Sequence, residues 1–345
     1  MEERRMKYIF ELNHPKHYYQ FKYVMQSLRK QGHEIKVLAR DKDVLLDVLK
    51  EEGVDYTIFG KHNKSMSAKI FGTFALVRNY IAIVRQYQPD IIVSKGSLYG
   101  TLTAKLMGKK SVIFPDSEVV KVTNNFVVPL CTKVVTPQSF QLDFGEKHCR
   151  INGLFEDCYL SPQAFQPNPE IIEKYALKRP YAIIRFVGWF ANHDVGNNGF
   201  TLEEKIKLVE TIAKNMTVYI SSEKPLPEPL SQYKLNTPAS LIHDVLSYAD
   251  LYVGDSQTMA AESALLGTPS IRSNSFVGPN DMSNFKILES KYGLLRNIAK
   301  PQDAIDLAAE WSAHSQKNDW KNKQKDYYTQ VGNINANIVS LLTNI

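Results

Sequence analysis

The segment 251–272 constrains the fold of this chain more than any other. It reads LYVGDSQTMAAESALLGTPSIR: a short apolar run, a polar turn, a stretch of small residues and a second short apolar run. Gly267 stands where a helix C-cap belongs, and Thr268-Pro269 leads into the second run. The pattern therefore predicts strand, tight turn, helix and strand, which is the repeating unit of a parallel α/β sheet.

The turn at 254–256 also predicts a site for an anion. Such a turn presents free backbone N–H groups and the positive end of a helix dipole above the sheet, where a diphosphate binds well. Glu262 follows Thr258 by one helical turn on the same face. A carboxylate there would repel phosphate but accept hydrogen bonds from a ribose diol. We therefore expect a nucleotide diphosphate with a sugar attached, its phosphates bound by Ser256, Gln257, Thr258 and Met259.

Short apolar runs and amphipathic stretches alternate along most of the 345 residues, which is enough chain for about two domains. We expect a Rossmann-like domain over 1–155, a proline-containing linker over 156–180, a second Rossmann-like domain over 181–320, and a C-terminal helix in 321–345 that packs back on the first domain. Two doubly wound domains of this kind would face a central cleft. The expected strands are 8–12, 34–39, 57–59, 91–94, 111–114, 133–136, 181–186, 217–221, 251–253 and 270–271. The expected helices are 18–31, 44–52, 68–88, 96–106, 201–214, 240–248, 258–266, 286–292, 303–315 and 324–342.

Composition favours a cytoplasmic protein. Apolar residues make up 43% and charged residues 23% of the chain, and no apolar run approaches the roughly 20 residues that span a bilayer. The charged N-terminus leads directly into the first expected strand, so no signal peptide is expected. The three cysteines lack CxxC spacing and are interpreted as idle thiols in a reducing compartment.

Charge is distributed unevenly between the two halves. Residues 1–155 hold 24 Lys and Arg against 15 Asp and Glu, whereas the remainder holds 18 against 21. A basic half suits an anionic membrane or an anionic acceptor, and no nucleic-acid-binding module accompanies it. Residues 61–85 are basic and amphipathic without any acidic residue. Two interpretations of them stay open: a core-packed helix with a charged outer face, or peripheral contact with the inner face of the cell membrane.

In the first half, polar residues that follow two expected strands are candidates for catalysis. His14 suits a general base, because its ordinary pKa lies near working pH. Asp116 and Glu118 come just after the strand 111–114, where a carboxylate can activate a hydroxyl. The alternative for His14 and for both carboxylates is helix capping or a solvated turn. His17 and Lys95 are expected to bind the acceptor.

In the second half, further polar residues stand at expected strand ends. Arg185 can clamp a phosphate with its planar guanidinium group. The remaining expected donor-binding residues are His193, Asp194, Ser222, Glu223 and His243. Asp41-Lys42-Asp43 has the form of a metal-binding DxD motif but not its setting, so neither a metal nor a cofactor is expected.

Several of these motifs together resemble a known family. They are His14-Pro15-x-His17, Gly32-His33-Glu34, Ala39–Asp43, Arg185-Phe186-Val187-x-Trp189, His193-Asp194, Ser222-Glu223 and 254–259. The chain resembles domain of unknown function 354, a set of predicted glycosyltransferases. The resemblance implies a GT-B fold, with the donor bound mainly by the second domain and the acceptor by the first. The wider superfamily includes UDP-N-acetylglucosamine 2-epimerases and the lipid-intermediate transferase of peptidoglycan synthesis, and it places Glu262 near the nucleotide ribose.

The expected function is metal-independent transfer of a sugar from a nucleotide-diphosphate sugar, UDP-linked, to a glycan or lipid-linked acceptor in cell-surface polysaccharide or glycolipid synthesis. The nucleotide sugar is a substrate here, not a cofactor, and nucleic acid is not an expected partner. Two alternatives stay open. One is a sugar-nucleotide 2-epimerase, and the other is a sugar-nucleotide-binding protein without catalysis.

Overall fold

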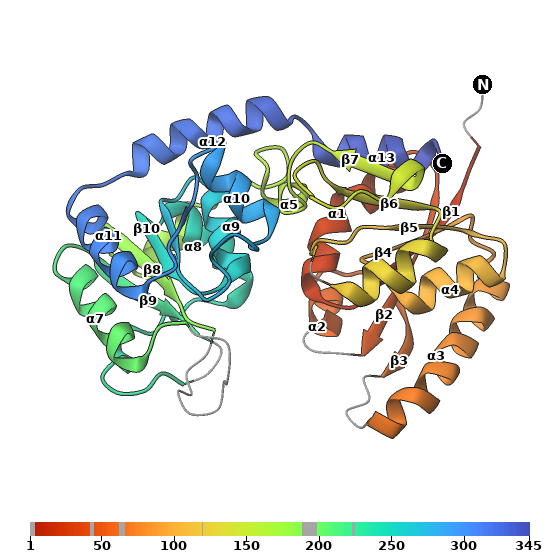
Figure 1. Cartoon of the computed structure of the whole chain (residues 1–345), viewed down its shortest axis with the longest axis horizontal. Helices are drawn as coiled ribbons and strands as arrows, with labels where there is room; N and C mark the ends of the chain where they lie inside the picture. The colour runs from red at the N-terminus through yellow and green to blue at the C-terminus, as the bar shows by residue number, and fades with distance from the viewer. Residues whose placement is uncertain (1–3, 42–44, 62–65, 119, 188–198, 223–224) are drawn as a thin grey trace. The chain divides into compact units, whose positions relative to one another are not determined.

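The computed structural model describes residues 4–41, 45–61, 66–118, 120–187, 199–222 and 225–345. For residues 61 and 66–75 it describes only the backbone. The chain divides into two compact units. Unit 1 comprises Met1–Tyr159 and Asn333–Ile345, and unit 2 comprises Leu160–Gly332. The chain thus leaves unit 1 after Tyr159 and returns to it after Gly332 (Figure 1).

Unit 1 is built on a seven-stranded parallel sheet in the order β3-β2-β1-β4-β5-β6-β7. Its strands are β1 (Lys7–Leu12), β2 (Glu34–Asp41), β3 (Tyr56–Lys61), β4 (Ile91–Ser94), β5 (Lys110–Ile113), β6 (Lys133–Pro137) and β7 (His148–Ile151). Its helices are α1 (Pro15–Lys30), α2 (Leu45–Glu51), α3 (Met66–Tyr87), α4 (Leu98–Leu106), α5 (Asp157–Leu160, which ends one residue into unit 2) and α13 (Ile334–Thr343), with short turns η1 (Thr123–Val127), η2 (Val128–Leu130) and η3 (Gly145–Lys147).

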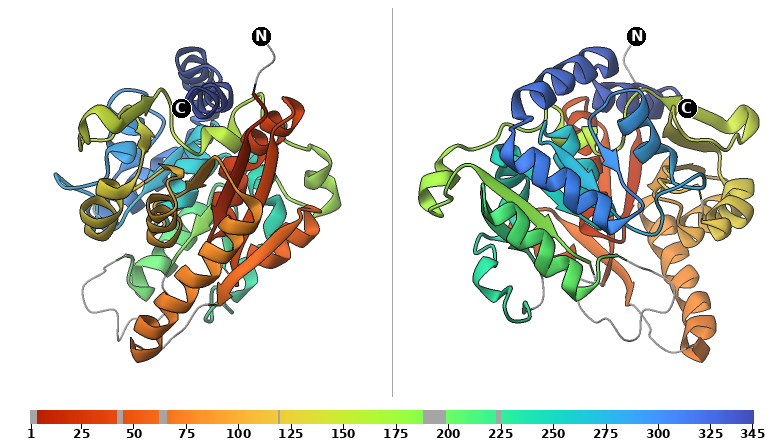
Figure 2. Two further views of the ribbon diagram at one scale, coloured as in Figure 1. Left: turned by 90° about the vertical axis from the view of Figure 1, so that its right-hand side faces the viewer. Right: turned by 60° about the vertical axis from the view of Figure 1, so that its left-hand side comes forward.

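Helices cover both faces of this sheet. α1 packs against α2 and α13 on one face, and α3 packs against α4 on the other (Figures 1 and 2). From Leu76 onward, α3 buries Tyr80 and Val84 in a core cluster with Ile9 of β1, while Arg78 points outward. This described part of α3 is therefore a core-packed helix with a charged outer face.

Unit 2 contains a five-stranded parallel sheet in the order β12-β11-β10-β8-β9. Its strands are β8 (Tyr181–Arg185), β9 (Thr217–Ser221), β10 (Leu251–Gly254), β11 (Ser270–Arg272) and β12 (Arg296–Asn297). Its helices are α6 (Glu170–Lys174), α7 (Leu202–Ala213), α8 (Ile242–Tyr248), α9 (Gln257–Leu265), α10 (Ser283–Ser290), α11 (Pro301–Ala313) and α12 (Lys317–Val331), with turns η4 (Ser231–Tyr233) and η5 (Ala239–Leu241). α7 packs against α11, and α8 packs against α9; all four helices are labelled in Figure 1.

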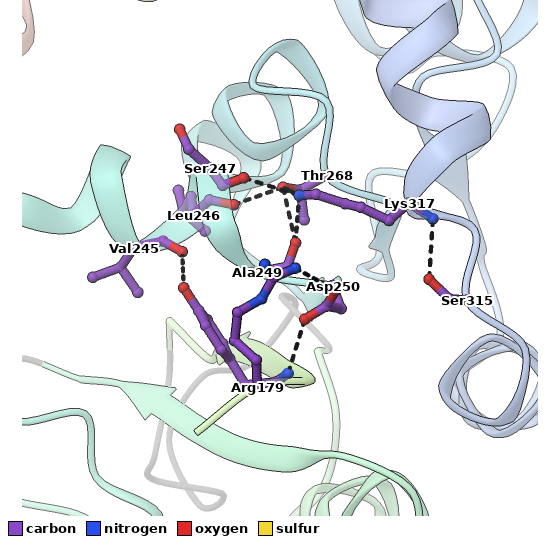
Figure 3. Close-up of polar contacts among 10 residues, drawn as sticks. Arg179, Val245, Leu246, Ser247, Ala249, Asp250, Thr268, Ser315 and Lys317 are labelled. Atoms are coloured by element: carbon purple, nitrogen blue, oxygen red, sulfur yellow. Dashed lines mark hydrogen bonds and ion pairs between the residues drawn. The ribbon is translucent and has the colours of Figure 1, made fainter. Parts of the chain in front are cut away.

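Two lysines of α12 donate hydrogen bonds to the carboxyl ends of α8 and α9 and so hold α12 against the rest of unit 2. Lys317 Nζ donates to the carbonyl oxygen of Ser247 at 3.0 Å and to Thr268 Oγ1 at 2.8 Å (Figure 3). One turn further along α12, Lys321 Nζ donates to the carbonyl oxygen of Leu266 at 2.7 Å. Cations at these positions complement the negative ends of the two helix dipoles.

The observed elements correct one expected helix and add two strands. A single helix over 324–342 is wrong, because Gly332 takes φ 73° and separates α12 from α13. The edge strands β7 and β12 were not predicted. In β7 only Ile151 is buried, and β12 has two residues, so neither carries an apolar run. Among the described residues, no helix is both long enough and apolar enough to cross a membrane.

Candidate functional site

Each sheet has one point where its strand order reverses. In unit 1 this point lies between β1 and β4, and in unit 2 it lies between β8 and β10. Open parallel α/β sheets bind ligands beyond the carboxyl ends of their strands at such points. The carboxyl ends of these four strands are therefore the places to look for a site.

Unit 1 has a pocket of about 270 Å³ at this position. Residues after β1, β4 and β5 form its wall, together with residues that begin α4 and η1. The polar side chains in the wall include those of Asn13, His17, Lys95, Ser97, Asp116 and Thr123. The structure thus brings together three of the residues that the sequence singles out, His17, Lys95 and Asp116.

Lys95 and Asp116 form an ion pair at this pocket. Lys95 Nζ lies 3.4 Å from Asp116 Oδ2 and donates to Gln20 Oε1 at 2.8 Å. Partial burial alone would raise the pKa of Asp116, but the charges of Lys95 and Lys16 outweigh it and lower the pKa to about 2. The Asp116 side chain is 46% exposed, so an ionised carboxylate stands open at the pocket.

His17 is a neutral side chain in this pocket. Burial, with a contribution from Lys95, lowers its pKa to about 3. The backbone N–H of Asn13 donates to His17 Nδ1 at 3.2 Å. Because Nδ1 accepts this bond, the proton of the neutral ring belongs on Nε2. His17 therefore acts as a hydrogen-bond donor at physiological pH.

His14 and Glu118 occupy positions different from the pocket wall. His14 is the N-cap of α1, and its Nδ1 accepts from the N–H of Lys16 at 3.1 Å. Capping, one of the two interpretations open for His14, is thus what the structure shows, and the capping bond occupies the ring nitrogen lone pair. Glu118 Oε1 accepts from the N–H of Gln141 at 3.2 Å. Glu118 is not among the residues that line the pocket.

In unit 2, the turn after β10 is held close to the end of β8. A Cβ on Gly254 would lie 2.2 Å from the carbonyl oxygen of Arg185, so only glycine allows this approach. Asp255 Oδ1 accepts from the N–H of Val187 at 2.7 Å. Asn274 Nδ2 donates to the carbonyl oxygen of Asp255 at 3.0 Å. These contacts fix the turn that leads into α9.

α9 begins at this turn with its amide groups directed past the strand end. Ser256 is the N-cap, and its side chain accepts from the N–H of Met259. Among the described residues, no hydrogen bond engages the N–H groups of Gln257 and Thr258. Unengaged amides and a helix dipole at one point are groups that can bind an anion. The helix ends at Leu265, and Gly267 follows with φ 72°.

Glu262 and His243 meet in the described structure. His243 Nε2 lies 3.3 Å from Glu262 Oε1, and only 8% of the Glu262 side chain is exposed. Burial would lower the pKa of His243, but the charge and hydrogen bond of Glu262, together with the charge of Asp244, outweigh it and raise the pKa above the ordinary value. Two residues predicted separately to bind the donor thus form one buried pair on α8 and α9.

The other predicted donor residues fall at the neighbouring strand ends or outside the description. Arg185 ends β8, and its Nη1 donates to Ser221 Oγ at 3.4 Å. Ser222 follows directly after β9. His193, Asp194 and Glu223, with the Lys42-Asp43 part of the DxD motif, lie outside the described residues. Within the described parts of the chain, no group of three or more His, Cys, Asp or Glu side chains is arranged to hold a metal ion.

Two residues were not predicted: one lines the unit 1 pocket, and the other lies behind it. Asn13 lines it and donates through Nδ2 to Glu11 Oε1 at 3.0 Å. Glu11 lies in β1 and is fully buried. A charged residue inside an otherwise apolar strand (YIFEL) was the available signal, because a carboxyl group in a central strand is kept only with partners.

Comparison with solved structures defines the fold as GT-B-like. UDP-GlcNAc 2-epimerase from Methanocaldococcus jannaschii superposes with a TM-score of 0.72 and 13% identity, over 99% of this chain and 100% of that one. Spinosyn forosaminyltransferase SpnP superposes with a TM-score of 0.68 and 11% identity, over 99% of this chain and 100% of that one. MurG from Acinetobacter baumannii superposes with a TM-score of 0.63 and 14% identity, over 99% of this chain and 100% of that one. At these identities the likeness shows the fold alone, shared by glycosyltransferases and epimerases.

The family comparison is more specific. Residues 7–160 match the family described as "Protein of unknown function (DUF354)", which confirms the resemblance found in the sequence for this part of the chain. The match ends at residue 160, where unit 2 begins, so the motifs of unit 2 that contribute to the resemblance lie beyond it. No curated protein sequence matches the chain significantly.

Proposed function

We propose that this protein is a glycosyltransferase that moves a sugar from a UDP-linked donor to a glycan or lipid-linked acceptor of cell-surface polysaccharide or glycolipid synthesis. Unit 2 binds the donor, and unit 1 binds the acceptor. The observation that carries the proposal is the start of α9, where unengaged amides of Gln257 and Thr258 stand one turn before the buried carboxylate of Glu262.

The donor is bound by groups that match its parts. The amides at the start of α9 and the guanidinium group of Arg185 bind the two phosphates. Glu262 accepts hydrogen bonds from the ribose hydroxyls, and His243 holds its carboxylate in place. As the bond between the anomeric carbon and the diphosphate breaks, negative charge builds on the leaving group. The same amides and Arg185 stabilise that charge without a metal ion.

Asp116 is the residue that we assign as the base. It is ionised, 46% exposed and part of the pocket wall. An acceptor hydroxyl in the pocket would donate its proton to Asp116 while its oxygen forms the new bond to the anomeric carbon. His14 is the weaker candidate, because its Nδ1 lone pair accepts the capping bond from Lys16.

The experiment is to incubate the purified protein with a panel of UDP-sugars, with and without glycan and lipid-linked acceptors, and to identify products by mass spectrometry. The proposal expects a glycosylated acceptor, UDP release that survives EDTA, and a rate at least 100-fold lower in Asp116→Asn. Glu146→Gln, at an exposed position of unit 1, is the matched control. Activity abolished by EDTA would contradict the metal-free scheme.

The competing activity is 2-epimerisation of the nucleotide sugar, since structures of epimerases share the fold. It needs the same donor site but no acceptor. Proton NMR of the sugar with no acceptor present distinguishes the two. A change of configuration at C2 would contradict transfer, whereas an unchanged sugar together with a glycosylated acceptor supports it.

A further inference from the structure

The unit 1 pocket is polar, yet its charges are already matched. Lys95 and Asp116 are the residues of its wall that are charged at neutral pH, and they pair with one another at 3.4 Å. Lys16, close to this wall, pairs with Glu156 at 2.8 Å. A ligand anion would therefore meet an ionised Asp116 and a lysine that already has a partner. The charges of the wall do not favour a phosphate or a carboxylate.

Asn13 brings an unsatisfied acceptor to this wall. Its Nδ2 donates to Glu11 Oε1 at 3.0 Å, and its backbone N–H donates to His17 Nδ1 at 3.2 Å. Its Oδ1 is buried and has no hydrogen-bond partner among the described residues. Leaving a carbonyl group in that state costs about 1–3 kcal/mol, so a ligand that supplies an O–H or N–H donor gains from binding there.

Glu11 fixes the orientation of the Asn13 side chain by accepting the hydrogen bond from Nδ2. A Cβ on Gly100 would lie 2.5 Å from Glu11 Oε2 and 3.0 Å from Tyr80 Oη, so the missing side chain of Gly100 makes room for both groups. Burial raises the pKa of Glu11, and the hydrogen bond that opposes the rise comes from Asn13 Nδ2 to Oε1 at 3.0 Å. A buried carboxyl group is costly in a central strand. Its hydrogen bond to Nδ2 fixes the orientation of the Asn13 amide, in which Oδ1 has no partner among the described residues.

His17 supplies the complementary group. With Nδ1 occupied by the Asn13 amide, the neutral imidazole offers a donor at Nε2. The wall thus presents an acceptor on Asn13 and a donor on His17, four residues along the chain. A hydroxyl group both donates and accepts, whereas a phosphate at neutral pH mainly accepts.

We propose that the unit 1 pocket binds an uncharged, hydroxyl-bearing sugar ring, with Asn13 Oδ1 accepting from a ring hydroxyl or N–H and His17 donating to it. Asn13 is then a specificity-determining residue, and Glu11 is a positioning residue that acts through it. The inference deepens the proposed function and rests on it only in calling this sugar the acceptor.

The test uses the full chain without donor. Saturation-transfer NMR measures binding of methyl glucoside, methyl mannoside and N-acetylglucosamine through their C–H protons. Inorganic phosphate, which has no such protons, is added to each sugar as a competitor at equal concentration and ionic strength. We expect at least one of the sugars to bind, at least tenfold more weakly to Asn13→Ala, and phosphate not to compete. Asn344→Ala, at an exposed position of unit 1, should bind like the wild type. Glu11→Gln keeps an acceptor for Asn13 Nδ2 and should retain binding better than Glu11→Leu.

Phosphate that binds in preference to every sugar, no binding of any probe, or unchanged sugar binding by Asn13→Ala would each overturn the inference. The competition between sugar and phosphate is measured on the wild type alone. It therefore tests the inference even if Asn13→Ala does not fold. UDP is titrated into the same samples. Sugar binding without UDP binding would contradict the proposed function alone, and UDP binding without sugar binding would contradict this inference alone.

Discussion

His243 Nε2 and Glu262 Oε1 lie 3.3 Å apart and join α8 to α9 beneath the proposed donor site. Burial of His243 would by itself lower the pKa of its imidazole, and the charge and hydrogen bond of Glu262, with a contribution from Asp244, reverse that effect. The pair gives a rigid position to the carboxylate that we propose for the ribose. It also makes the imidazole a spectroscopic reporter of that carboxylate.

Glu262→Gln should lower the pKa of His243 below 6.5, because burial remains while the compensating charge is lost. A histidine whose pKa is higher in the folded than in the unfolded state stabilises the protein at pH values below its unfolded pKa. This stabilisation disappears as the pH rises through the folded pKa. The variant should therefore lose most stability relative to wild type below about pH 6.5. NMR titration of the imidazole protons and denaturant unfolding measure both effects. An unchanged His243 pKa would contradict the pairing.

Gly254→Ala should destabilise unit 2 by about 2 kcal/mol or more, because its Cβ would lie 2.2 Å from the backbone oxygen of Arg185. Gly199→Ala is the matched comparison. There the new Cβ would meet the side chain of Asp255 at 2.4 Å, and a side chain moves more easily than backbone. Urea unfolding measures the loss of stability in each variant, and we expect the larger loss in Gly254→Ala. Equal losses would argue against the backbone contact as the cause.

His17→Gln should flatten the pH dependence of stability on the acidic side. A folded pKa of about 3 against an ordinary value of 6.5 means that the unfolded chain binds the proton first, so stability falls as pH drops below 6.5. For wild type this contributes a loss of about 2 kcal/mol between pH 7 and pH 5. The difference in unfolding free energy between wild type and variant isolates His17 from the other histidines. A difference that stays constant across that range would refute the neutral state of His17.

Lys317→Met should destabilise the protein by about 2–3 kcal/mol, because it removes the donor to the carbonyl oxygens of Ser247 and Ala249 and to Thr268 Oγ1 (Figure 3). Lys325→Met, at an exposed position on the same helix, should change stability by less than about 0.5 kcal/mol. Thermal unfolding of both proteins compares them directly. Similar melting temperatures for the two variants would show that the buried contacts of Lys317 add nothing.

The sequence predicted the strands that carry apolar runs and missed those that do not. β1, β4 and β10 are buried along nearly their full length, so their pattern is visible without a structure. β7 lies at the edge of its sheet with three partly or fully exposed residues, and its pairing with β6 depends on the assembled sheet. Edge position is a property of the topology, not of the local sequence.

The site was predictable at the level of strand ends but not of atoms. Asp116 and Lys95 were each singled out, yet their pairing at 3.4 Å follows from the adjacency of β4 and β5. The capping bond of His14 and the buried, unsatisfied Oδ1 of Asn13 depend on which way single side chains turn. Residue spacing carries no information on that.

The central claim is that α9 and Glu262 bind a ribonucleoside diphosphate, and calorimetry of UDP and 2′-deoxy-UDP with wild type and Glu262→Ala tests it most directly. The account predicts that wild type binds UDP about tenfold more tightly than the deoxy form, about 1.4 kcal/mol, and that the variant does not distinguish them. The account would be contradicted if wild type bound neither nucleotide, or if the variant kept the full preference.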